Sequence, residues 1–543
     1  MDKPNTLAMY LDVSRNAVMT VDALKRFMTF LAKFGYNELM LYHEDTFEVE
    51  GEPEFGYMRG RYSVEELQTI VEFGETLGIT VAPAINTLAH LDQLFQWSRY
   101  AKVRDCNNIL LVDSEDTYAL IDKIFATMRK CYKTNRIHLG LDEAHNMGFG
   151  RYKDIHHHIP SKEERYEMFF RHTAKVLEIA KKYGFTDPIM DSDMYFSIAC
   201  GYYYTYNPNM ITEDIVKLVP EGVAVNFWSY FENKEIYEAM LVNHERLNRR
   251  ITFMGGAINW ETLTPQNIRA IDYAEDQVSV LRNHPKVKDF YYAMFGDDGG
   301  EADYFASLPA IARFADLVNG IDDIKITKAK FKEATGIDFD DFCKLDLPAC
   351  CVPGSEHQFS CYDKCQLYSD PFLGLQDILI SEEETEPEYY RSVSCKLAKF
   401  TDNEEYGYLF KTGKTLCDFL AYKSVLGKHV REAYQANDIE RLKEIEKDFT
   451  KAEKNLQRFI NAYQEQWMKN KKPFGLEIHD IRMGGQLARL QHCHNRLNDY
   501  LEGKLDVIPE LEEKLDPNVK VGNGESVMKT RRWHTIASTS RFL

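Results

Sequence analysis

Residues 137–145 read Ile137-His138-Leu139-Gly140-Leu141-Asp142-Glu143-Ala144-His145. The alternating apolar residues predict a buried strand over 137–141, and two adjacent carboxylates follow where this strand should leave its sheet. Two acids held side by side at a partly desolvated strand end cannot both ionise freely, so we expect one pKa to rise. A carboxyl group that stays protonated near neutral pH can act as a general acid. The stretch therefore predicts a catalytic site at the end of a strand.

Short β-type runs like this one alternate with amphipathic helical patterns before residue 323. The runs cover 8–13, 38–42, 80–85, 137–141, 188–190, 223–227, 251–255 and 290–294, and the helical patterns include 21–34, 64–77, 117–130, 163–182 and 266–282. Eight strands alternating with helices are typical of a closed parallel barrel with its helices outside. A doubly wound open sheet is the alternative, but the turn after the first run, residues 11–15, lacks the expected glycines. We predict an α/β chain with a (β/α)8 TIM barrel over residues 1–323.

The β signal fades beyond residue 323. Stretches rich in Glu, Lys, Leu, Ala and Gln cover 403–436, 439–467 and 478–501, which predicts packed helices. Residues 348–371 are predicted to form an irregular loop region. The expected second domain, 324–543, is therefore mostly α-helical.

The composition excludes several classes of protein. With 44% hydrophobic and 28% charged residues, the 543-residue chain can bury a large core and is not disordered. A formal net charge of −19 argues against nucleic acid or an anionic membrane as partner. No apolar run approaches the roughly 20 residues that span a bilayer. The start, Met-Asp-Lys-Pro-Asn-Thr, does not resemble a signal peptide, so we expect a cytoplasmic bacterial protein unless such a peptide has been removed.

The cysteines indicate neither a disulfide framework nor a metal site. Eleven cysteines, an odd number, fit a reducing compartment. The cluster Cys350, Cys351, Cys361 and Cys365 lacks the paired spacing of a zinc site, and adjacent cysteines rarely bind one tetrahedral ion. We predict no metal and no cofactor.

Polar and aromatic residues follow each predicted strand, at the barrel end where active sites collect. In strand order they are Asp12 and Arg15; 43–45; 86–90; Asp142 and Glu143; 191–193; 228–230; 259–261; and 295–301. Charged hydrogen-bonding groups and flat aromatic faces around one mouth suit a sugar ring. Some of these residues could instead have a purely structural role. Asp12 and Asp45 could be helix N-caps, Trp228 and Trp260 core aromatics, and Arg15 part of an ion pair.

The run from His138 to Ala144 resembles the His-x-Gly-x-Asp-Glu signature of glycoside hydrolase family 20, the β-N-acetylhexosaminidases. Further motifs look like the streptococcal-type branch: Asp12-Val-Ser-Arg15-Asn, Glu44-Asp45-Thr46-Phe47, Phe55-Gly-Tyr-Met-Arg-Gly60, Thr87-Leu-Ala-His90-Leu, Gly255-Gly256-Ala257, Asp480-Ile-Arg-Met-Gly-Gly485 and Trp533-His-Thr-Ile-Ala537. Members of that branch usually carry a small α/β domain ahead of the barrel, and we expect that domain to be absent here.

The resemblance implies a retaining exo-β-N-acetylhexosaminidase that uses substrate-assisted catalysis. In that mechanism the sugar's own 2-acetamido oxygen attacks the anomeric carbon and gives an oxazolinium intermediate. Glu143 would protonate the leaving oxygen and later deprotonate water, Asp142 would hold the acetamido N–H, and Tyr230 would steady the acetamido oxygen. The substrate would be an oligosaccharide or glycoconjugate with a terminal N-acetylhexosamine, and relatives suggest a homodimer.

The resemblance also implies the substrate-binding residues. Arg15 would grip the 3- and 4-hydroxyls of the sugar, while Asp297 and Glu301 would bind the 4- and 6-hydroxyl end. Trp260 resembles a pocket aromatic and Trp228 lies near Tyr230 in the sequence. His90 would be a supporting hydrogen-bonding residue near the acids.

Two pocket positions depart from the family pattern. Where close relatives have Met-Trp-Ser-Asp-Met, this chain has Asp191 in place of the tryptophan, and where they have Trp-Gly-Asp, it has Phe295. Fewer aromatic walls and an added carboxylate should alter the contacts to the sugar. We expect a shifted selectivity, toward N-acetylgalactosamine over N-acetylglucosamine.

Two rival functions need weighing. Residues 141–145 include the Asp-Glu-Ala-His of helicase-type ATPases, but those proteins need an upstream phosphate loop. Gly413-Lys414-Thr415 lies downstream, with Tyr408 where the loop's first glycine belongs, so this reading is rejected. The remaining alternative is a catalytically degenerate carbohydrate-binding barrel, which Asp191 and Phe295 would fit but an intact catalytic set would not.

Overall fold

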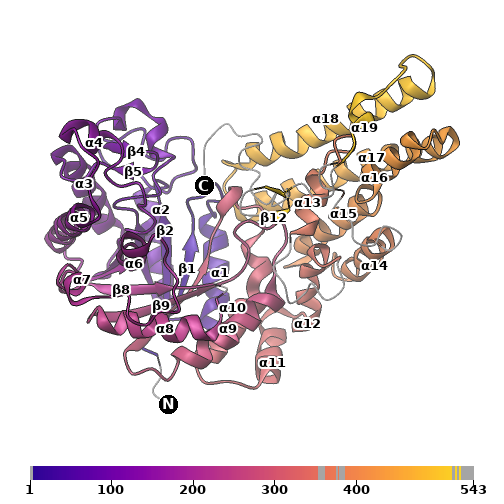
Figure 1. The fold of residues 1–543 in the computed structure, drawn as a ribbon. Coiled ribbons are helices and arrows are strands. Elements are labelled where there is room, and N and C mark those ends of the chain that lie inside the picture. Colours follow the sequence, from indigo (N-terminus) through magenta and orange to yellow (C-terminus); the bar gives the residue numbers. More distant parts are fainter. Residues whose placement is uncertain are drawn as a thin grey trace.

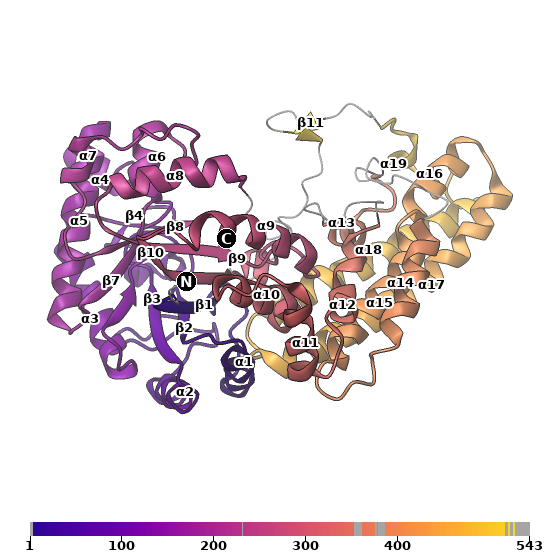
Figure 2. The same ribbon diagram turned by 90° about the horizontal axis from the view of Figure 1, so that it is seen from below.

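The computed structural model describes residues 4–230, 232–351, 361–374, 377, 386–515, 520–521 and 525–526. Figures 1 and 2 show two parts side by side, a barrel with its surrounding helices and a group of helices from the C-terminal part of the chain. The motif Trp533–Ala537 and part of the predicted loop region 348–371 lie outside the described residues.

The first part is a closed barrel of parallel strands in the order β1-β10-β9-β8-β7-β6-β3-β2. Its strands are β1 (Thr6–Asp12), β2 (Glu38–His43), β3 (Thr80–Ile85), β6 (Arg136–His138), β7 (Asp187–Asp191), β8 (Ala224–Trp228), β9 (Arg250–Gly256) and β10 (Val287–Met294). The predicted barrel is confirmed, and each predicted run contributes one strand. The run 137–141 was too long, because β6 ends at His138.

Helices surround the barrel (Figure 1). They are α1 (Val21–Lys33), α2 (Val64–Thr76), α3 (Glu115–Cys131), α4 (Arg151–His156), α5 (Lys162–Lys182), α6 (Asp193–Cys200), α7 (Glu213–Lys217), α8 (Lys234–Arg246), α9 (Asn267–Leu281) and α10 (Leu308–Val318), with a small hairpin of β4 (Arg104–Cys106) and β5 (Ile109–Leu110). Capping boxes, Ser63 with Glu66 and Ser161 with Glu164, satisfy the first free N–H groups of α2 and α5 and so fix where these helices begin.

The barrel interior is filled rather than open. Alternate residues of β1 point inward, so Ala8 and Tyr10 pack in an inner cluster while the residues between them face the helices. At the N-terminal end of the barrel, Arg136 donates to Thr6, Glu38 and Tyr291 across the interior. Because that end is closed, a cavity that opens from the barrel interior must lie at the C-terminal ends of the strands.

The second part is helical, as predicted. It contains α11 (Ile324–Thr335), α12 (Phe339–Phe342), α13 (Tyr362–Tyr368), α14 (Glu386–Ala398), α15 (Gly407–Lys423), α16 (Leu426–Gln435), α17 (Ile439–Asn470), α18 (Leu476–Leu501) and α19 (Pro509–Glu512), and the two-residue strands β11 (Lys520–Val521) and β12 (Glu525–Ser526). The stretch 403–436 forms the two helices α15 and α16, whereas α13 lies in the region predicted to be irregular. The domain boundary at 323 remains a prediction. The described helices include none that combines the length and apolar character of a membrane span.

The two parts are joined by a buried ion cluster. Lys364 of α13 contacts the carboxylates of Asp298 and Glu301 in the loop after β10. Arg482 of α18 lies 3.1 Å from Asp298 Oδ1 and 3.6 Å from Glu301 Oε1, and it donates to the Asp298 carbonyl at 2.7 Å. His479 also bonds the Gly299 carbonyl at 2.8 Å. The helical part therefore holds the β10 loop through charges removed from water.

Replacing Arg482 with methionine should strongly destabilise the fold. The variant leaves two buried carboxylates with Lys364 as their remaining cation in this cluster, and breaking a buried ion pair costs about 3–5 kcal/mol. The free energy of unfolding from urea titration measures the loss. Arg441→Met is the matched control, because its side chain is 49% exposed and pairs with an exposed Glu444; its cost should stay below about 1 kcal/mol. Equal losses in the two variants would contradict a stabilising role for the cluster.

Candidate active site

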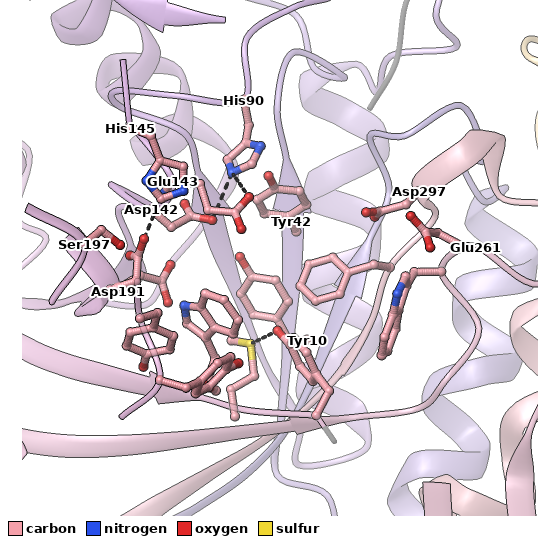
Figure 3. A pocket seen from close by; sticks show the side chains of 18 of the residues that line it. Tyr10, Tyr42, His90, Asp142, Glu143, His145, Asp191, Ser197, Glu261 and Asp297 are labelled. Atoms are coloured by element: carbon pink, nitrogen blue, oxygen red, sulfur yellow. Dashed lines mark hydrogen bonds and ion pairs between the residues drawn. The ribbon is translucent and has the colours of Figure 1, made fainter. Parts of the chain in front are cut away.

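A cavity of about 620 Å³ lies at the C-terminal end of the barrel. It is lined by all but one of the predicted site residues: Arg15, His90, Asp142, Glu143, Asp191, Trp228, Tyr230, Trp260, Phe295 and Asp297. Figure 3 shows Asp142, Glu143 and Asp191 on one side of it and Asp297 and Glu261 on the other. We call these the Asp142 side and the Arg15 side, since Arg15 pairs with Asp297.

Left-handed backbone after β6 brings both adjacent acids to the cavity. Gly140, Leu141 and Glu143 have φ values of 65°, 75° and 50°. A Cβ on Gly140 would lie 2.9 Å from Asn86 Oδ1, so this position requires glycine. In a regular strand, neighbouring side chains point to opposite faces. Here the chain leaves strand geometry before Asp142, and both carboxylates reach the same mouth.

Asp142 is held as an anion by His90. His90 Nε2 lies 3.0 Å from Asp142 Oδ2 and 3.6 Å from Glu143 Oε2. Burial opposes the charge on the imidazole, but Asp142 outweighs it and raises the pKa of His90 to about 9. Burial likewise disfavours the Asp142 anion, yet the charge and hydrogen bond of His90 lower the pKa of Asp142. The predicted rise of one pKa in the pair therefore does not fall on Asp142, because His90 supplies a compensating positive charge.

Two carboxyls with raised pKa on the Asp142 side lie at the end of the neighbouring strand β7 and just after it. Burial, followed by the charge of Asp142, raises the pKa of Asp191 and of Asp193 well above the ordinary value. Asp193 Oδ2 accepts the Glu143 N–H at 2.9 Å, so it fixes the backbone of the second acid. Glu143 itself is the more open of the pair, with its side chain 49% exposed against 23% for Asp142.

Arg15 dominates the opposite side. Its guanidinium lies 2.9 Å from Asp297 Oδ1 and 3.2 Å from Glu44 Oε1. Burial, only partly offset by Arg15, raises the pKa of Asp297 to about 6. The Asp12 carboxylate accepts hydrogen bonds from backbone N–H groups, including that of Ser14 and, at 2.9 Å, that of Gly296. Asp12 therefore connects the loops after β1 and β10 and does not cap a helix. These contacts fix the position of the Arg15–Asp297 pair.

The interpretation of Asp45 as a helix N-cap is also wrong. Asp45 accepts from Arg59 Nε at 2.8 Å within a buried ion pair, and it precedes no helix. It therefore organises the loop after β2 away from the cavity.

Aromatic rings form the floor and one flank of the cavity. Trp228 stacks on Tyr230 with ring centroids 5.7 Å apart, and Trp260 lies 5.3 Å from Tyr230. Phe295 lies 5.9 Å from Tyr230. Among the described residues, the Tyr230 hydroxyl donates to Met254 Sδ alone, a weak acceptor, at 3.6 Å. A ligand oxygen could therefore replace this contact at little cost.

Glu301 is the predicted site residue that the structure does not bring to the cavity. Its carboxylate is 3% exposed and belongs to the cluster with Lys364 and Arg482. Those cations come from the helical domain, so the sequence around Glu301 does not predict them. Glu261, which directly follows Trp260 after β9, instead lines the cavity near Asp297 (Figure 3). Its position after a barrel strand already indicated that Glu261 could line the cavity.

Other lining residues escaped the sequence analysis. Tyr10 and Tyr42 are inward-facing strand residues at the cavity floor, and Tyr202, 63% exposed, lies at its rim. The inward tyrosines could have been found from strand periodicity. The rim tyrosine belongs to a loop, which no periodicity marks.

One group of described residues has the spacing to hold a metal ion, namely His90, Asp142 and Glu143. Its members already pair with one another through hydrogen bonding and charge. The cysteine cluster of the sequence analysis does not bring three ligands together in the described part of the chain.

The barrel, its acid pair and its aromatic pocket are those of a glycoside hydrolase. Two family models match the chain: "Glycosyl hydrolase family 20, catalytic domain" over residues 8–247 and "Glycoside Hydrolase 20C C-terminal domain" over residues 340–529. The chain therefore belongs to glycoside hydrolase family 20 and is a glycoside hydrolase. Its assignment to the streptococcal-type branch remains a prediction.

The chain is also similar to solved structures at low identity. A β-N-acetylhexosaminidase from Bacteroides fragilis NCTC 9343 is 18% identical over 61% of this chain and 70% of its own, with a TM-score of 0.45. An exo-β-N-acetylglucosaminidase from Vibrio harveyi, in complex with N-acetylglucosamine, is 15% identical over 64% and 59%, with a TM-score of 0.46. A β-N-acetylhexosaminidase from Streptomyces coelicolor A3(2) is 18% identical over 62% and 71%, with a TM-score of 0.44. No curated protein matches the chain.

Replacing His90 with glutamine should remove a pH-dependent part of the stability. The folded pKa of His90 is about 9 and the unfolded value about 6.5. The pair with Asp142 therefore stabilises the fold fully below pH 6.5, and this contribution is lost as the pH rises through 9. The stability advantage of the wild type over His90→Gln, about 3 kcal/mol, should vanish by about pH 10.

Urea titrations at several pH values between 6 and 10 measure this difference. The variant His157→Gln, at an exposed histidine, is the control and should give a flat difference. A His90→Gln difference that stays constant or grows with pH would disprove the ion pair.

Proposed function

We propose that this chain is a retaining exo-β-N-acetylhexosaminidase that acts by substrate-assisted catalysis. The observation that carries the proposal is the placement of Asp142 and Tyr230 around one cavity, after β6 and β8, with Glu143 beside them. An anionic Asp142 can accept the acetamido N–H, and the Tyr230 hydroxyl can donate to the acetamido oxygen. These two contacts would aim that oxygen at the anomeric carbon.

The two acids then have different tasks because their surroundings differ. Asp142, kept ionised by His90, would offset the positive charge that develops on the oxazolinium ring. Glu143, half exposed at the rim, can reach both the leaving oxygen and an incoming water. Intramolecular attack of a well-oriented group can lower the barrier by about 7–11 kcal/mol, and proton transfer from a positioned acid contributes about 10²–10⁴-fold.

The remaining contacts fit a terminal sugar. The Arg15–Asp297 pair, on the side opposite the acids, offers charged hydrogen-bonding groups to the ring hydroxyls. Trp228, Tyr230 and Trp260 offer faces for the sugar's C–H surface.

Replacing Glu143 with glutamine should reduce kcat/KM, and the loss should be larger for a leaving group that needs protonation. For an N-acetylglucosamine disaccharide the loss should be about 10²–10⁴-fold. For a nitrophenyl glycoside it should be much smaller, because a phenolate leaves with little protonation. Asp142→Asn is the matched control: it weakens acetamido orientation, so its losses on the two substrates should be similar.

The 2-acetamido group provides the decisive comparison. The wild type should hydrolyse nitrophenyl β-N-acetylhexosaminides and not the matched plain β-glucosides, and a thiazoline analogue of the cyclised intermediate should inhibit it. Turnover of plain glucosides would overturn the substrate-assisted mechanism. A wild type that binds N-acetylhexosamine but hydrolyses no β-linked derivative would instead support the carbohydrate-binding alternative.

We also propose that the pocket favours galacto-configured substrate. Phe295, a smaller ring than the tryptophan of relatives, lies next to the Arg15 guanidinium with 5.4 Å between Cζ and the ring centre. The smaller ring should leave room for an axial 4-hydroxyl. The ratio of kcat/KM for the nitrophenyl N-acetylgalactosaminide over the N-acetylglucosaminide should exceed one and should fall in Phe295→Trp. Equal turnover of both sugars by the wild type would count against this selectivity.

A further inference from the structure

The proposed function places the sugar's 2-acyl group above the end of β7. In the barrel β7 lies between β6 and β8, and Asp142 and Tyr230 follow those two strands. A group that bridges Asp142 and Tyr230 therefore crosses the C-terminal end of β7. In a trans amide the N–H and C=O point apart, so the acyl substituent lies on the N–H side, toward Asp142.

Asp191 is the last residue of β7 and lines the cavity at this point. Its backbone N–H bonds the Gly140 carbonyl at 3.0 Å, which locks the residue beside the Asp142 loop. Asp142, Asp191 and Tyr230 all line the same cavity. Figure 3 shows Asp191 on the Asp142 side of the cavity.

The Asp191 carboxyl has unused hydrogen-bonding capacity. Oδ1 accepts from Asn226 Nδ2 at 2.7 Å. Oδ2 has His138 Nε2 at 3.7 Å, beyond hydrogen-bond distance, and no closer partner within the described part of the chain. The residue is 6% exposed, and burial together with Asp142 raises the pKa of its carboxyl. In either protonation state Oδ2 can accept a hydrogen bond, and a protonated carboxyl can also donate one.

We infer that Asp191 makes this a site for 2-acylamido sugars whose acyl group carries a hydroxyl, N-glycolyl hexosamines above all. The inference rests on the proposed function. An acetyl methyl group against Asp191 would leave a buried polar oxygen without a partner. A glycolyl hydroxyl would satisfy it, and leaving such a group unsatisfied costs about tenfold or more in binding.

Two synthetic acyl groups isolate polarity from size. N-glycolyl and N-propionyl side chains have nearly the same volume and differ by a hydroxyl in place of a methyl. The experiment measures kcat/KM for the nitrophenyl β-glycosides of both, with the N-acetyl compound as reference. The wild type should prefer glycolyl over propionyl by about tenfold or more.

Variants at Asp191 show whether this residue is the cause. In Asp191→Leu the glycolyl-to-propionyl ratio should fall to one or below, because leucine offers an apolar surface of similar size. Asp191→Asn keeps the shape and can still hydrogen bond, so it should retain a ratio above one. Comparing ratios between variants cancels the intrinsic reactivity difference of the two amides.

The possible failures are distinguishable. A wild type that hydrolyses the N-acetyl compound but shows a ratio of one or less overturns this inference and leaves the hexosaminidase proposal intact. An unchanged ratio in Asp191→Leu overturns it as well. If no 2-acylamido glycoside is hydrolysed, both proposals are wrong. The wild-type ratio alone can overturn the inference, so the inference stays testable even if a variant folds poorly.

Discussion

The ion pair between His90 and Asp142 sets the electrostatics of the whole pocket. Its 3.0 Å hydrogen bond keeps one carboxylate charged among buried groups. That single negative charge then acts on its neighbours, where it adds to burial in raising the pKa of Asp191, Asp193 and the Tyr230 hydroxyl. The Asp142 side thus places an anion beside carboxyls whose pKa is raised, an arrangement suited to stabilising a positive charge that develops beside the anion.

The helical domain contributes to the site although it supplies none of the predicted catalytic residues. The loop after β10 carries Asp297 into the cavity, and its next residue, Asp298, is held by Lys364 and Arg482. The helical domain therefore stabilises the loop that carries Asp297 to the Arg15 side of the pocket. Because the ions in this cluster are buried, movement of either domain would leave charges unpaired, which favours a rigid junction.

The sequence predicted the barrel because each strand is an apolar run bounded by polar residues, a local signal. It also predicted most of the pocket, since strand ends meet at one mouth. It failed where the deciding partner is remote in sequence. The acid of the pair that is held ionised is selected by His90, which is 52 positions away from Asp142. Glu301 looked like a pocket residue until its partners in α13 and α18 were known.

Adjacency of the two acids has a structural cost that the fold must offset. Leu141 and Glu143 both adopt left-handed backbone, which costs on the order of 1–3 kcal/mol for each non-glycine residue. Specific bonds hold the loop in this shape: His138 Nδ1 accepts the Gly140 N–H at 3.2 Å, and Asp193 accepts the Glu143 N–H. A strand continuing through Asp142 would avoid the strain but would turn one acid away from the cavity. The strained loop is therefore the price of placing a charge-stabilising group and a proton donor at consecutive positions.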